Sequence, residues 1–461
     1  MTSHVPALVV GGGISGLVCA YALRKAGIDA QIVEASPRPG GLIRSEKREG
    51  FLLELGPQSF SGTGQLRELC RELGIESELV EAPPRAPRFL LIDGQLKNAP
   101  LSPPAFLASS LFSVKTKWSI FRDLFSKSTP PDSDESVAAF VRRKFSAELL
   151  DKLVGPFVSG IYAGDPEKLS LRGAFPQLYD AERASGSIVR GMIRLVKTKK
   201  VPREKPTLLT FRDGNETIVQ ALAAKLGASL RCGASACAIR RRGTGQTPHY
   251  ELTLGPDNSQ EITADNLVIA TTTQTAGSLL QEVDNGFAEI LGGIAYAPVA
   301  VVSIGYCKQD VARSLDGFGF LIPRAAGLRT LGTVWNSSLF AARAPEGTAL
   351  LTSFVGGVTD AQAATLSSDE LVSFVHSEIA PLMQIRQPPI FASVTVYSRA
   401  LPQYNLGHTE RLATLEKLRT QFPGLYLTGN YFRGPAIGTC VEQALAVAEE
   451  IRGRVSGKTT S

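Results

Sequence analysis

The stretch "ALVVGGGISGLVCAYALRKAGIDAQIVEAS", residues 7–36, decides the fold of this chain. Its apolar residues 8–10 predict a short buried strand, and residues 14–26 predict a helix that ends at Gly27. Residues 28–34 predict a second strand. This strand–helix–strand order is the βαβ unit with which many nucleotide-binding domains begin.

The glycine motif Gly11-x-Gly13-x-x-Gly16 lies between the first strand and the helix, where a dinucleotide-binding fingerprint is expected. Such glycines allow a tight turn, close approach of a pyrophosphate, and close packing of helix on strand. Glu34 lies 18 residues beyond Gly16, where a carboxylate can accept hydrogen bonds from ribose hydroxyls and disfavours a 2′-phosphate. The motif therefore predicts an adenosine diphosphate moiety and argues against NADP. The alternative is a glycine turn without a ligand.

Length and composition limit the classes of protein that need to be considered. The 461 residues suggest two or three domains, and the net charge of +6 is too small to indicate nucleic-acid binding, although it permits an acidic substrate or an anionic membrane surface. The six cysteines include no C-x-x-C pair and the four histidines are scattered, so no metal site is expected. The longest apolar run, residues 296–306, is shorter than the ~20 residues of a membrane span, and no targeting segment is expected.

A second group of glycines favours FAD over NAD. Arg38, Gly40 and Gly41 follow directly after the ribose-binding acid, and "FLLELGPQSF" then supplies Gly56-Pro57. This arrangement resembles the extended fingerprint of flavoproteins in the amine-oxidase and phytoene-desaturase group, whose Gly-Pro pair lies against the flavin. The resemblance implies FAD as the cofactor, with no separate nicotinamide site.

Further segments resemble one family of that group, the oxygen-dependent, FAD-containing protoporphyrinogen oxidases. They are "PPAFLAS", "SGIYAGDPEKLSL", "GFGFLIP", "LPQYNLGH" and "LTGNYFRGPAIGTC", within a resemblance that extends from about residue 6 to about residue 452. It implies oxidation of protoporphyrinogen IX to protoporphyrin IX. In this family flavin takes hydride from the macrocycle and dioxygen re-oxidises the flavin, giving hydrogen peroxide, and three cycles remove six hydrogens.

The expected fold class is mixed α/β and α+β. A Rossmann-like FAD-binding domain, residues 1–85, 200–275 and 405–455, is interrupted by a mixed-sheet substrate-binding domain, residues 86–100 and 276–404. Residues 101–199 are expected to form a helical domain and residues 456–461 a flexible tail. The stretch 196–206 is rich in proline and lysine and predicts a linker or an exposed loop.

The residues predicted to bind FAD come from the two glycine turns, the Gly-Pro segment and the carboxyl-terminal part of the chain. They are Gly11, Gly12, Gly13, Ile14, Ser15, Gly16, Glu34, Ala35, Arg38, Gly41, Leu42, Gly56, Pro57, Gln58, Ser59, Ala236, Tyr397, Gly429, Ala436, Ile437 and Gly438. Relatives often have Trp at the position of Tyr397.

The resemblance also implies a substrate pocket. Arg88 matches the family's propionate-pairing arginine, and its alternative is an ordinary surface arginine. Phe318 and Leu321 match residues that sandwich a pyrrole ring, and Phe354 matches a further pocket wall, with plain core packing as the alternative. Gly160 matches a backbone approach to a ring nitrogen, or is simply a turn glycine. No side chain is expected to be an essential acid or base, because the flavin carries the difficult step.

The carboxyl-terminal motif departs from the family pattern. Thr439 stands where relatives often have Asp, and Pro435 stands where they have a small residue or valine. Thr439 and Glu442 have the spacing of a capping box, which predicts that the last helix begins there. Its N-terminus is expected to face the flavin and to stabilise negative charge on the reduced cofactor.

Residues 101–131 combine aromatic and basic side chains. Phe106, Leu107, Leu111, Phe112, Trp118, Phe121, Leu124 and Phe125 alternate with Lys115, Lys117, Arg122 and Lys127, against the single acid Asp123. Such a segment can lie on a membrane surface. The alternative is a helix whose apolar face packs on its own domain.

Three alternatives to protoporphyrinogen oxidation stay open. They are the same chemistry on coproporphyrinogen III, a flavin amine oxidase, and a non-catalytic flavoprotein scaffold. The expected partners are a porphyrinogen and dioxygen, with a membrane surface, a homodimer and a downstream metal chelatase as further expectations. The expected location is the cytoplasm, at the inner face of a membrane.

Overall fold

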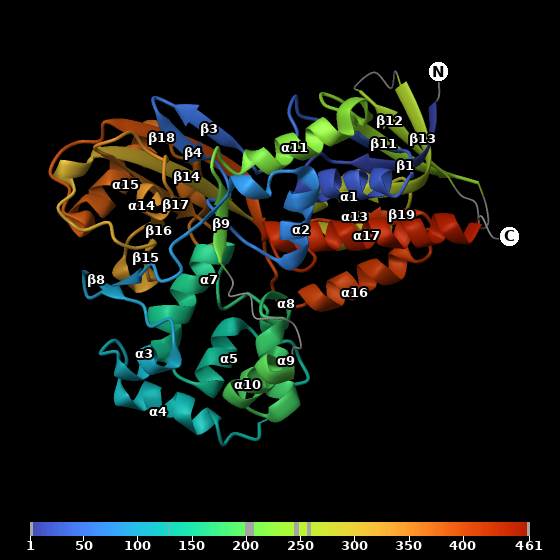
Figure 1. The fold of residues 1–461 in the computed structure, drawn as a ribbon. Coiled ribbons are helices and arrows are strands. Elements are labelled where there is room, and N and C mark those ends of the chain that lie inside the picture. The colour runs from blue at the N-terminus through green and yellow to red at the C-terminus, as the bar shows by residue number, and fades with distance from the viewer. Residues whose placement is uncertain (1–2, 129, 199–206, 244–248, 256–259, 459–461) are drawn as a thin grey trace.

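The computed structural model describes residues 3–128, 130–198, 207–243, 249–255 and 260–458, and two seven-stranded sheets organise it (Figure 1). In the first sheet, parallel strands β10, β2, β1 and β13 are followed by antiparallel β12 and β11, and β19 pairs in parallel with the far end of β13. The bounds are β1 (Ser3–Val10), β2 (Ala30–Val33), β10 (Leu230–Arg231), β11 (Ala236–Arg242), β12 (His249–Leu254), β13 (Gln260–Ile269) and β19 (Leu425–Leu427).

The predicted βαβ unit is confirmed, and β1 is buried on both faces. Ala7 and Val9 contribute to one apolar core, while Leu8 and Val10 contribute to the other. The first core contains α1 (Ile14–Lys25), α2 (Gly64–Leu73), α11 (Glu216–Leu226) and α17 (Ile437–Lys458), and the second contains α12 (Thr273–Leu280), α13 (Asn285–Gly292) and α16 (His408–Arg419). Because a strand covered on both faces needs apolar residues throughout, "ALVV" is continuous rather than alternating.

The second sheet has the strand order β18-β14-β17-β16-β15-β7-β8, with helix α15 (Ser368–Met383) packed against it. The pair Asp93-Gly94 predicts a hairpin turn from its residue types alone, and its positive φ angles of 52° and 72° confirm that turn between β7 and β8. The strands are β7 (Arg88–Ile92), β8 (Gln95–Asn98), β14 (Tyr296–Cys307), β15 (Gly319–Leu321), β16 (Thr330–Val334), β17 (Thr348–Gly356) and β18 (Phe391–Pro402).

Short elements connect the two sheets. The hairpin β3 (Ser45–Arg48) and β4 (Phe51–Glu54) and the small sheet β5 (Phe60–Ser61), β9 (Leu208–Phe211) and β6 (Leu79–Glu81) lie between them in sequence, and α14 (Asn336–Leu339) follows β16. The remaining short helices are η1 (Glu76–Glu78), η2 (Leu150–Val154), η3 (Gly227–Ser229), η4 (Lys308–Asp310), η5 (Arg324–Ala326) and η6 (Ala361–Thr365).

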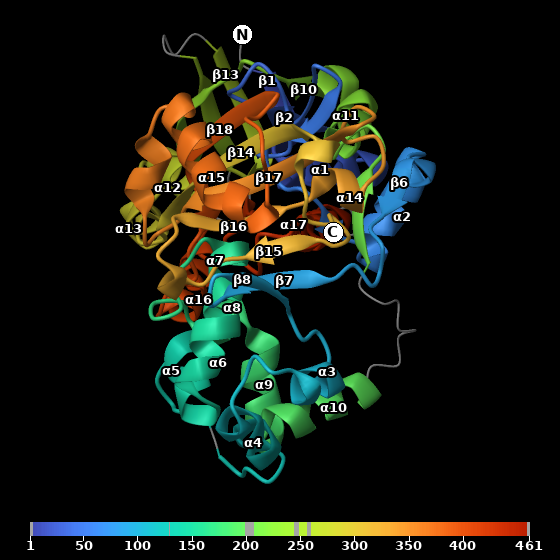
Figure 2. The same ribbon diagram turned by 90° about the vertical axis from the view of Figure 1, so that its left-hand side faces the viewer.

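The helices between β8 and β9 form a lobe beside the two sheets, as Figures 1 and 2 show. The lobe contains α3 (Pro103–Ala108), α4 (Val114–Asp123), α5 (Val137–Lys144), α6 (Ala147–Leu149), α7 (Gly155–Tyr162), α8 (Leu171–Ala174), α9 (Pro176–Ser185) and α10 (Ile188–Thr198). Its apolar core also takes in Leu90 and Ile92 of β7, so the lobe is joined to the second sheet by packing. The predicted linker starts inside α10, and residues 199–206 lie outside the described residues.

The last helix differs from its prediction at both ends. Because α17 begins at Ile437, Thr439 and Glu442 lie inside the helix, and the predicted capping box is wrong. The amide of Cys440 already donates to the carbonyl of Ala436, which starts the helix two residues early. At the other end α17 continues to Lys458, into the segment predicted as a tail, and residues 459–461 lie outside the described residues.

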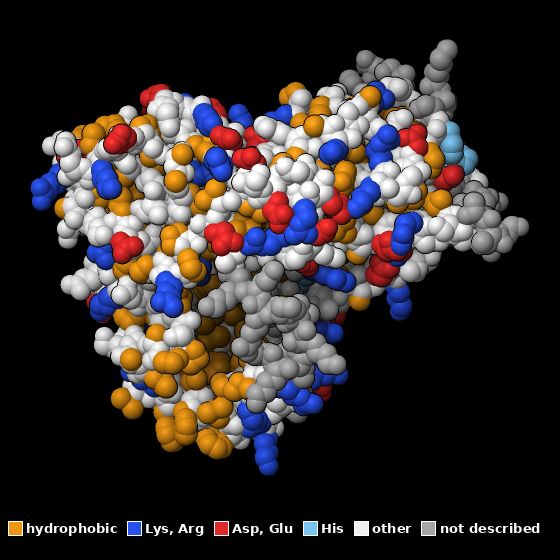
Figure 3. Space-filling model, viewed as in Figure 1, with side chains coloured by type: hydrophobic (Ala, Val, Ile, Leu, Met, Phe, Trp, Pro, Cys, Tyr) orange, Lys and Arg blue, Asp and Glu red, His pale blue; other side chains and the backbone are white. Residues whose placement is uncertain are grey.

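The surface of α3 and α4 carries exposed apolar side chains, visible as a hydrophobic patch at the lower left of Figure 3. Trp118 is 62% exposed, Phe125 68% and Val114 83%. Leu101, Leu107 and Phe121 are also exposed, whereas Phe106, Leu111 and Phe112 are buried in the core of the lobe. The segment thus divides its apolar residues between its own core and the surface.

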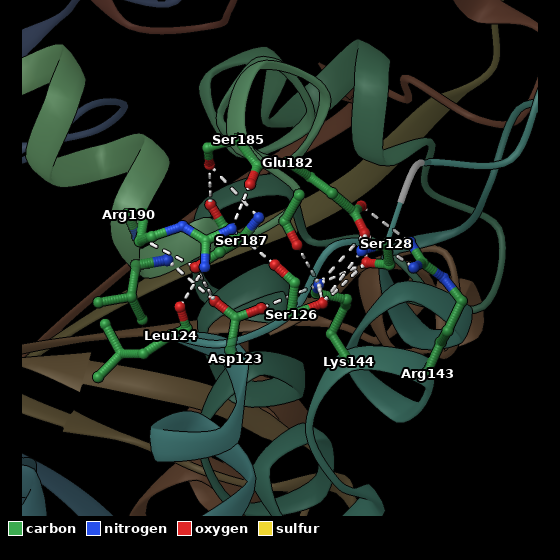
Figure 4. Close-up of polar contacts among 12 residues, drawn as sticks. Asp123, Leu124, Ser126, Ser128, Arg143, Lys144, Glu182, Ser185, Ser187 and Arg190 are labelled. Atoms are coloured by element: carbon green, nitrogen blue, oxygen red, sulfur yellow. Dashed lines mark hydrogen bonds and ion pairs between the residues drawn. The ribbon is translucent and has the colours of Figure 1, made fainter.

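A buried group of charges ties α4 to the rest of the lobe (Figure 4). We call Asp123, Arg143, Lys144 and Glu182 the Lys144 cluster. The Lys144 ammonium lies 2.9 Å from Asp123 Oδ1 and 3.4 Å from Glu182 Oε1, and Arg143 Nη1 lies 2.8 Å from the same Glu182 oxygen. The side chains of Asp123, Lys144 and Glu182 are buried and have lost their contacts with water. Each charge therefore depends on the others for stabilisation.

Candidate active site

The first glycine turn has the geometry of a phosphate cradle. Gly11 has a φ of +108°, and a Cβ there would lie 2.8 Å from the carbonyl oxygen of Ala270. A Cβ on Gly16 would lie 1.9 Å from the carbonyl oxygen of Gly11. At Gly13, by contrast, a Cβ would meet nothing within 4 Å, and no side chain caps the helix that begins at Ile14. The first amides of an α-helix, here those of Ile14 and Ser15 included, have no acceptor within the helix, and the space at Gly13 leaves room for a ligand to approach them.

Glu34 braces this turn from the end of β2. One carboxylate oxygen accepts a hydrogen bond from the amide of Gly12 at 2.5 Å, and the other accepts one from the amide of Ser36 at 2.8 Å. The backbone of Glu34 also bonds to Arg231 and Ala234, which brings the start of β11 at Ala236 to the same place. Ala35 beside it is exposed. This bracing role of the acid was not predicted from the sequence.

The second glycine turn lies against the first. The amide of Gly40 donates to the carbonyl of Gly12 at 2.7 Å, and Gly41 lies close to Gly13, since a Cβ on it would be 3.4 Å from the Gly13 Cα. Arg38 donates to the carbonyls of Pro39, Gly41 and Ile43, so its guanidinium holds the turn closed. Residues 28 positions apart in the sequence thus form one surface.

The start of α17 joins this surface. A Cβ on Gly438 would lie 2.8 Å from Thr63 Cγ2, and the thiol of buried Cys440 forms a hydrogen bond with Ser15 in the first turn of α1. The N-terminal ends of α1 and α17 therefore lie together. Ala436 is exposed just ahead of this helix start, whereas Ile437 is buried in the first core. Gly429, with a φ of +154°, packs its backbone against the ring of Tyr431.

A set of side chains fixes the Gly-Pro segment. The amide nitrogen of Gln58 donates to the carbonyls of Glu54 and Gly56, and Asn215 Nδ2 donates to the carbonyl of Pro57 at 2.7 Å. Asn336 Nδ2 in turn donates to Gln58 Oε1 at 2.7 Å. A Cβ on Gly56 would lie 2.0 Å from the carbonyl oxygen of Leu42, so the segment also presses on the second glycine turn. Ser59 follows, partly buried.

A buried ion pair between Glu54 and Arg343 lies next to this segment. We call these two residues, with their neighbours Ser45, Thr210 and Asn215, the Glu54 cluster. Arg343 Nη1 lies 2.7 Å from Glu54 Oε1, and both side chains are 2% exposed. The Asn215 amide and the Ser45 hydroxyl donate to the same carboxylate, and Arg343 Nη2 donates to the Phe211 carbonyl at 3.1 Å and to the Thr210 hydroxyl. Burial raises the pKa of the Glu54 carboxyl, and Arg343, Ser45 and Asn215 oppose that rise.

The two glycine turns, the Gly-Pro segment and the start of α17 together fit FAD. The uncapped helix start and the open space at Gly13 suit a pyrophosphate, and Glu34 has lone pairs left for ribose hydroxyls. Gly56, Pro57, Tyr397 and the start of α17 would hold the flavin ring. Burial raises the pKa of the Tyr397 hydroxyl, and the nearby charges of Arg38 and Arg44 partly oppose that rise.

The second sheet presents a row of predicted pocket residues on one face. Leu321 pairs with Gly332, Gly332 with Phe354, and Phe354 with Val301 across four neighbouring strands. Tyr397 lies on β18 opposite Val299, two residues from Val301 and therefore on the same face. Phe354 and Tyr397 belong to one apolar cluster. Because Gly332 has no side chain, Leu321 can lie close over it: a Cβ on Gly332 would be 3.0 Å from Leu321 Cδ2. Gly332 was not predicted as a site residue, although a glycine inside a strand can indicate such a close approach.

Gly160 and Arg88 lie at the other end of this row. A Cβ on Gly160 of α7 would lie 2.5 Å from Leu321 Cδ2, and Gly160 is nevertheless exposed, as expected of a pocket wall. Arg88 pairs with Gly319, and its guanidinium carbon lies 4.9 Å from the centre of the Phe318 ring. Phe318 packs with Ala82, Leu339 and Phe340 rather than with Leu321.

Arg88 is an unpaired cation. Among the described residues no carboxylate lies within ion-pair distance of it, and partial burial lowers the pKa of its guanidinium. It lines a pocket of about 350 Å³ together with Arg85, Asn98 and Leu101. An anionic ligand would restore the interactions that this guanidinium has lost to desolvation.

No helix among the described residues is both long and apolar enough to cross a bilayer.

Comparisons with known proteins agree with the geometry. The model of the flavin-containing amine oxidoreductases matches residues 14–452. The chain is 35% identical to protoporphyrinogen oxidase 1 of Arabidopsis thaliana chloroplasts, over 97% of this chain and 88% of that protein, and 33% identical to the chloroplast protoporphyrinogen oxidase of Nicotiana tabacum, over 98% and 86%. It is 29% identical to coproporphyrinogen III oxidase of Bacillus subtilis, over 96% and 97%.

Solved structures show the same fold. A candidate protoporphyrinogen oxidase from Exiguobacterium sp. 255-15 superposes with a TM-score of 0.81 at 25% identity, covering 98% of this chain and 99% of that one. Cyclohexylamine oxidase from Brevibacterium oxydans superposes with a TM-score of 0.74 at 18% identity, over 98% and 99%.

Proposed function

This chain belongs to the flavin-containing amine oxidoreductase family and is an FAD-dependent oxidoreductase, and on that premise we propose that it oxidises protoporphyrinogen IX to protoporphyrin IX with dioxygen as the acceptor. One observation carries the proposal: an apolar sheet face that carries Leu321 and Phe354 lies beside Arg88, which has no carboxylate partner among the described residues. A flat apolar macrocycle with carboxylates at one edge matches that arrangement.

When bound beside Gly56, Pro57, Tyr397 and the start of α17, FAD would supply the redox chemistry between the substrate and dioxygen. The protein binds and orients. Leu321 and Phe354 offer apolar contact to the faces of the macrocycle, and Arg88 pairs with a propionate through parallel hydrogen bonds. Gly160 on α7 packs directly against Leu321, so α7 covers this end of the sheet face. Each cycle would consume one dioxygen, so a complete oxidation requires three.

The side chains near this face do not supply an evident acid or base. Lys144, the lysine that is buried among the described residues, forms ion pairs inside the helical lobe. His408 is buried under Tyr404, and burial lowers its pKa to about 4. This supports the hypothesis that no side chain is an essential acid or base. It also weakens the amine oxidase alternative, in which a lysine is expected near the flavin.

Coproporphyrinogen III is the second candidate substrate, because a Bacillus subtilis relative carries that name. Its four propionates would need four partners. The sheet face carries Leu321, Phe354, Val301 and Tyr397, none of which is a cation, so propionates that point towards this face would meet apolar surface. The arrangement therefore favours the dicarboxylate.

The experiment is an anaerobic titration of the yellow holoenzyme. Protoporphyrinogen IX is expected to bleach the flavin absorbance faster than coproporphyrinogen III does, and to give porphyrin fluorescence once dioxygen is admitted, while benzylamine does neither. Bleaching by the amine alone would contradict the proposal, and absence of bleaching with all three would favour a non-catalytic scaffold.

We also infer that the patch on α3 and α4 contacts the inner face of a membrane. Trp118, Phe121 and Phe125 stack on one another at the surface, with Lys115, Lys117 and Arg122 on the same helix. Vesicles containing anionic lipid should co-sediment the holoenzyme, and the variant Trp118→Ser with Phe121→Ser should stay in the supernatant. Equal sedimentation of both would remove this inference. The homodimer and the contact with a metal chelatase stay predictions.

A further inference from the structure

Arg88 shares its pocket with a second arginine that the resemblance did not single out. Arg85 and Arg88 both line the 350 Å³ pocket, together with Asn98, Leu101 and Ala105, and no carboxylate is among its lining residues. Neither arginine forms an ion pair within the part of the chain that the structure describes. Many other arginines do, including Arg67, Arg142, Arg143, Arg240 and Arg343. Two cations without a partner in one pocket indicate a ligand with two negative charges.

The backbone holds the two arginines in place before any ligand arrives. They belong to "PPRAPR", in which the amide of Ala86 donates to the carbonyl of Pro83 at 3.0 Å and closes a turn around Arg85. The Pro87 carbonyl accepts from the amide of Phe318 at 2.7 Å, and the Arg88 carbonyl accepts from the amide of Ala99 at 2.7 Å. Three prolines fix φ in this short stretch, so little backbone entropy is left to lose on binding.

The two side chains differ in one contact. Both residues are exposed, but the Arg88 guanidinium also lies over the Phe318 ring, with its carbon 4.9 Å from the ring centre. The ring holds the Arg88 guanidinium at the wall of the pocket, whereas Arg85 projects from the turn at its rim. A carboxylate on either arginine would stay in contact with water.

We propose that Arg85 is a specificity-determining residue, which binds the second carboxylate of a dicarboxylate substrate whose first carboxylate is bound by Arg88. This inference rests on the proposed function, in which the substrate carries propionates on two neighbouring rings. It adds that both are recognised, and that the pocket between the β7–β8 hairpin and α3 selects for a pair of acids on one edge of the macrocycle.

The test compares the diacid with its dimethyl ester. Steady-state oxidation of protoporphyrinogen IX and of protoporphyrinogen IX dimethyl ester is measured in the same detergent for the wild-type holoenzyme and for Arg85→Gln. Losing one charge-assisted hydrogen-bonded pair at a partly exposed site should raise KM for the diacid about tenfold with kcat retained, and leave KM for the ester unchanged. Arg85→Lys should restore part of the affinity, because it keeps the charge but not the fork.

Lys97→Gln is the matched control, since it removes a positive charge from the adjacent strand β8, where Lys97 pairs with Asp93 at 3.2 Å outside the pocket. It should leave both KM values unchanged. An Arg85→Gln variant with unchanged KM for the diacid, or with the same change for diacid and ester, would overturn the inference while wild-type turnover still supports the proposed function. A wild-type enzyme that oxidises neither compound would instead overturn the proposed function.

Discussion

The protein buries charge in two places, and the two clusters are built differently. In the Glu54 cluster one arginine faces one carboxylate, and the remaining partners are neutral. In the Lys144 cluster the charges are shared, because Lys144 lies between two carboxylates and Glu182 lies between two cations. The first cluster therefore has no charged substitute if one member is lost, whereas the second does.

The clusters also differ in what they support. The Glu54 cluster lies beneath the Gly-Pro segment and connects β4, β9 and the loop after α14, so it supports the predicted flavin site. The Lys144 cluster joins α4, α5 and α9 and supports the surface that carries the exposed aromatic residues. Comparing them separates stability that serves the cofactor from stability that serves only the helical lobe.

The largest effect is expected for Arg343→Met. It leaves the Glu54 carboxylate buried without a cation, which should lower the free energy of unfolding by roughly 3–5 kcal/mol and release FAD. Urea unfolding followed by circular dichroism and by flavin fluorescence measures both. Glu54→Leu combined with Arg343→Met should regain most of the stability, because no charge is then left unpaired. A single variant that keeps its flavin and loses less than about 1 kcal/mol would contradict the role assigned to this pair.

A smaller effect is expected for Lys144→Met. Glu182 keeps Arg143, and Asp123 keeps the Ser187 hydroxyl at 2.9 Å and the Val189 amide at 3.0 Å, so the loss should be roughly 2 kcal/mol. The flavin absorbance spectrum should not change, since the cluster lies in the helical lobe. A shifted flavin spectrum would mean that the two regions are coupled and that the comparison fails.

Lowering the pH should change the contributions of the two clusters to the free energy of unfolding in opposite directions. In the Lys144 cluster burial would raise the pKa of Asp123 and Glu182, but hydrogen bonds from the Val189 amide, Lys144 and Arg143 outweigh it, so both pKa values are lowered. A lowered carboxyl pKa stabilises the folded state above the unfolded value of about 4, and that stability is lost as pH falls through the folded pKa. For Glu54 the pKa is raised, so its contribution has the opposite sign and favours folding more as pH falls.

For the wild type, the urea concentration at which half of the protein is unfolded is therefore expected to decrease as the pH is lowered below 4. Asp123→Asn should flatten that fall, and Glu54→Gln should steepen it slightly, because the variant removes the opposing contribution. Identical slopes for the three proteins would show that other carboxylates control acid stability.

The smallest effect is expected for Arg142→Gln. Arg142 is the neighbour of Arg143 on α5, but its ion pair with Glu167 is exposed on both sides. Exposed pairs contribute little, so the free energy of unfolding should change by less than about 0.5 kcal/mol. The Arg143→Gln variant, measured in parallel, should lose clearly more, because Arg143 pairs with fully buried Glu182. Equal losses would show that burial is not what distinguishes these neighbours.

The structural features that were predicted correctly from the sequence are those that depend on neighbouring residues. The strand, glycine turn and helix at the start of the chain and the Asp93-Gly94 hairpin are local, since each follows from the conformations that its own residues allow. The same local logic was wrong for α17: Thr439 and Glu442 have the right spacing for a cap, but Ile437 is already helical because the helix packs on α1.

Contacts between distant segments could not be predicted this way. Glu54 and Arg343 are 289 residues apart, and nothing in "LLELG" distinguishes a buried glutamate from an exposed one. Gly332 and Arg85 could have been noticed, the first as a glycine inside a strand and the second as a cation in a proline-rich turn. The meaning of Gly332, however, depends on Leu321 and Phe354, which only the folded sheet brings beside it, and that of Arg85 depends on the pocket that Asn98 and Ala105 complete.

The nucleotide site is assembled from the two ends of the chain, and this sets the order of events during synthesis. Strand β1 pairs with β13, and α1 packs against α17, which is made more than 400 residues later. At ribosomal rates of 5–20 residues per second, the glycine turn waits on the order of tens of seconds for its last partner. The growing chain therefore carries an unfinished cofactor site throughout most of translation, and FAD can complete the fold only after the last helix is made.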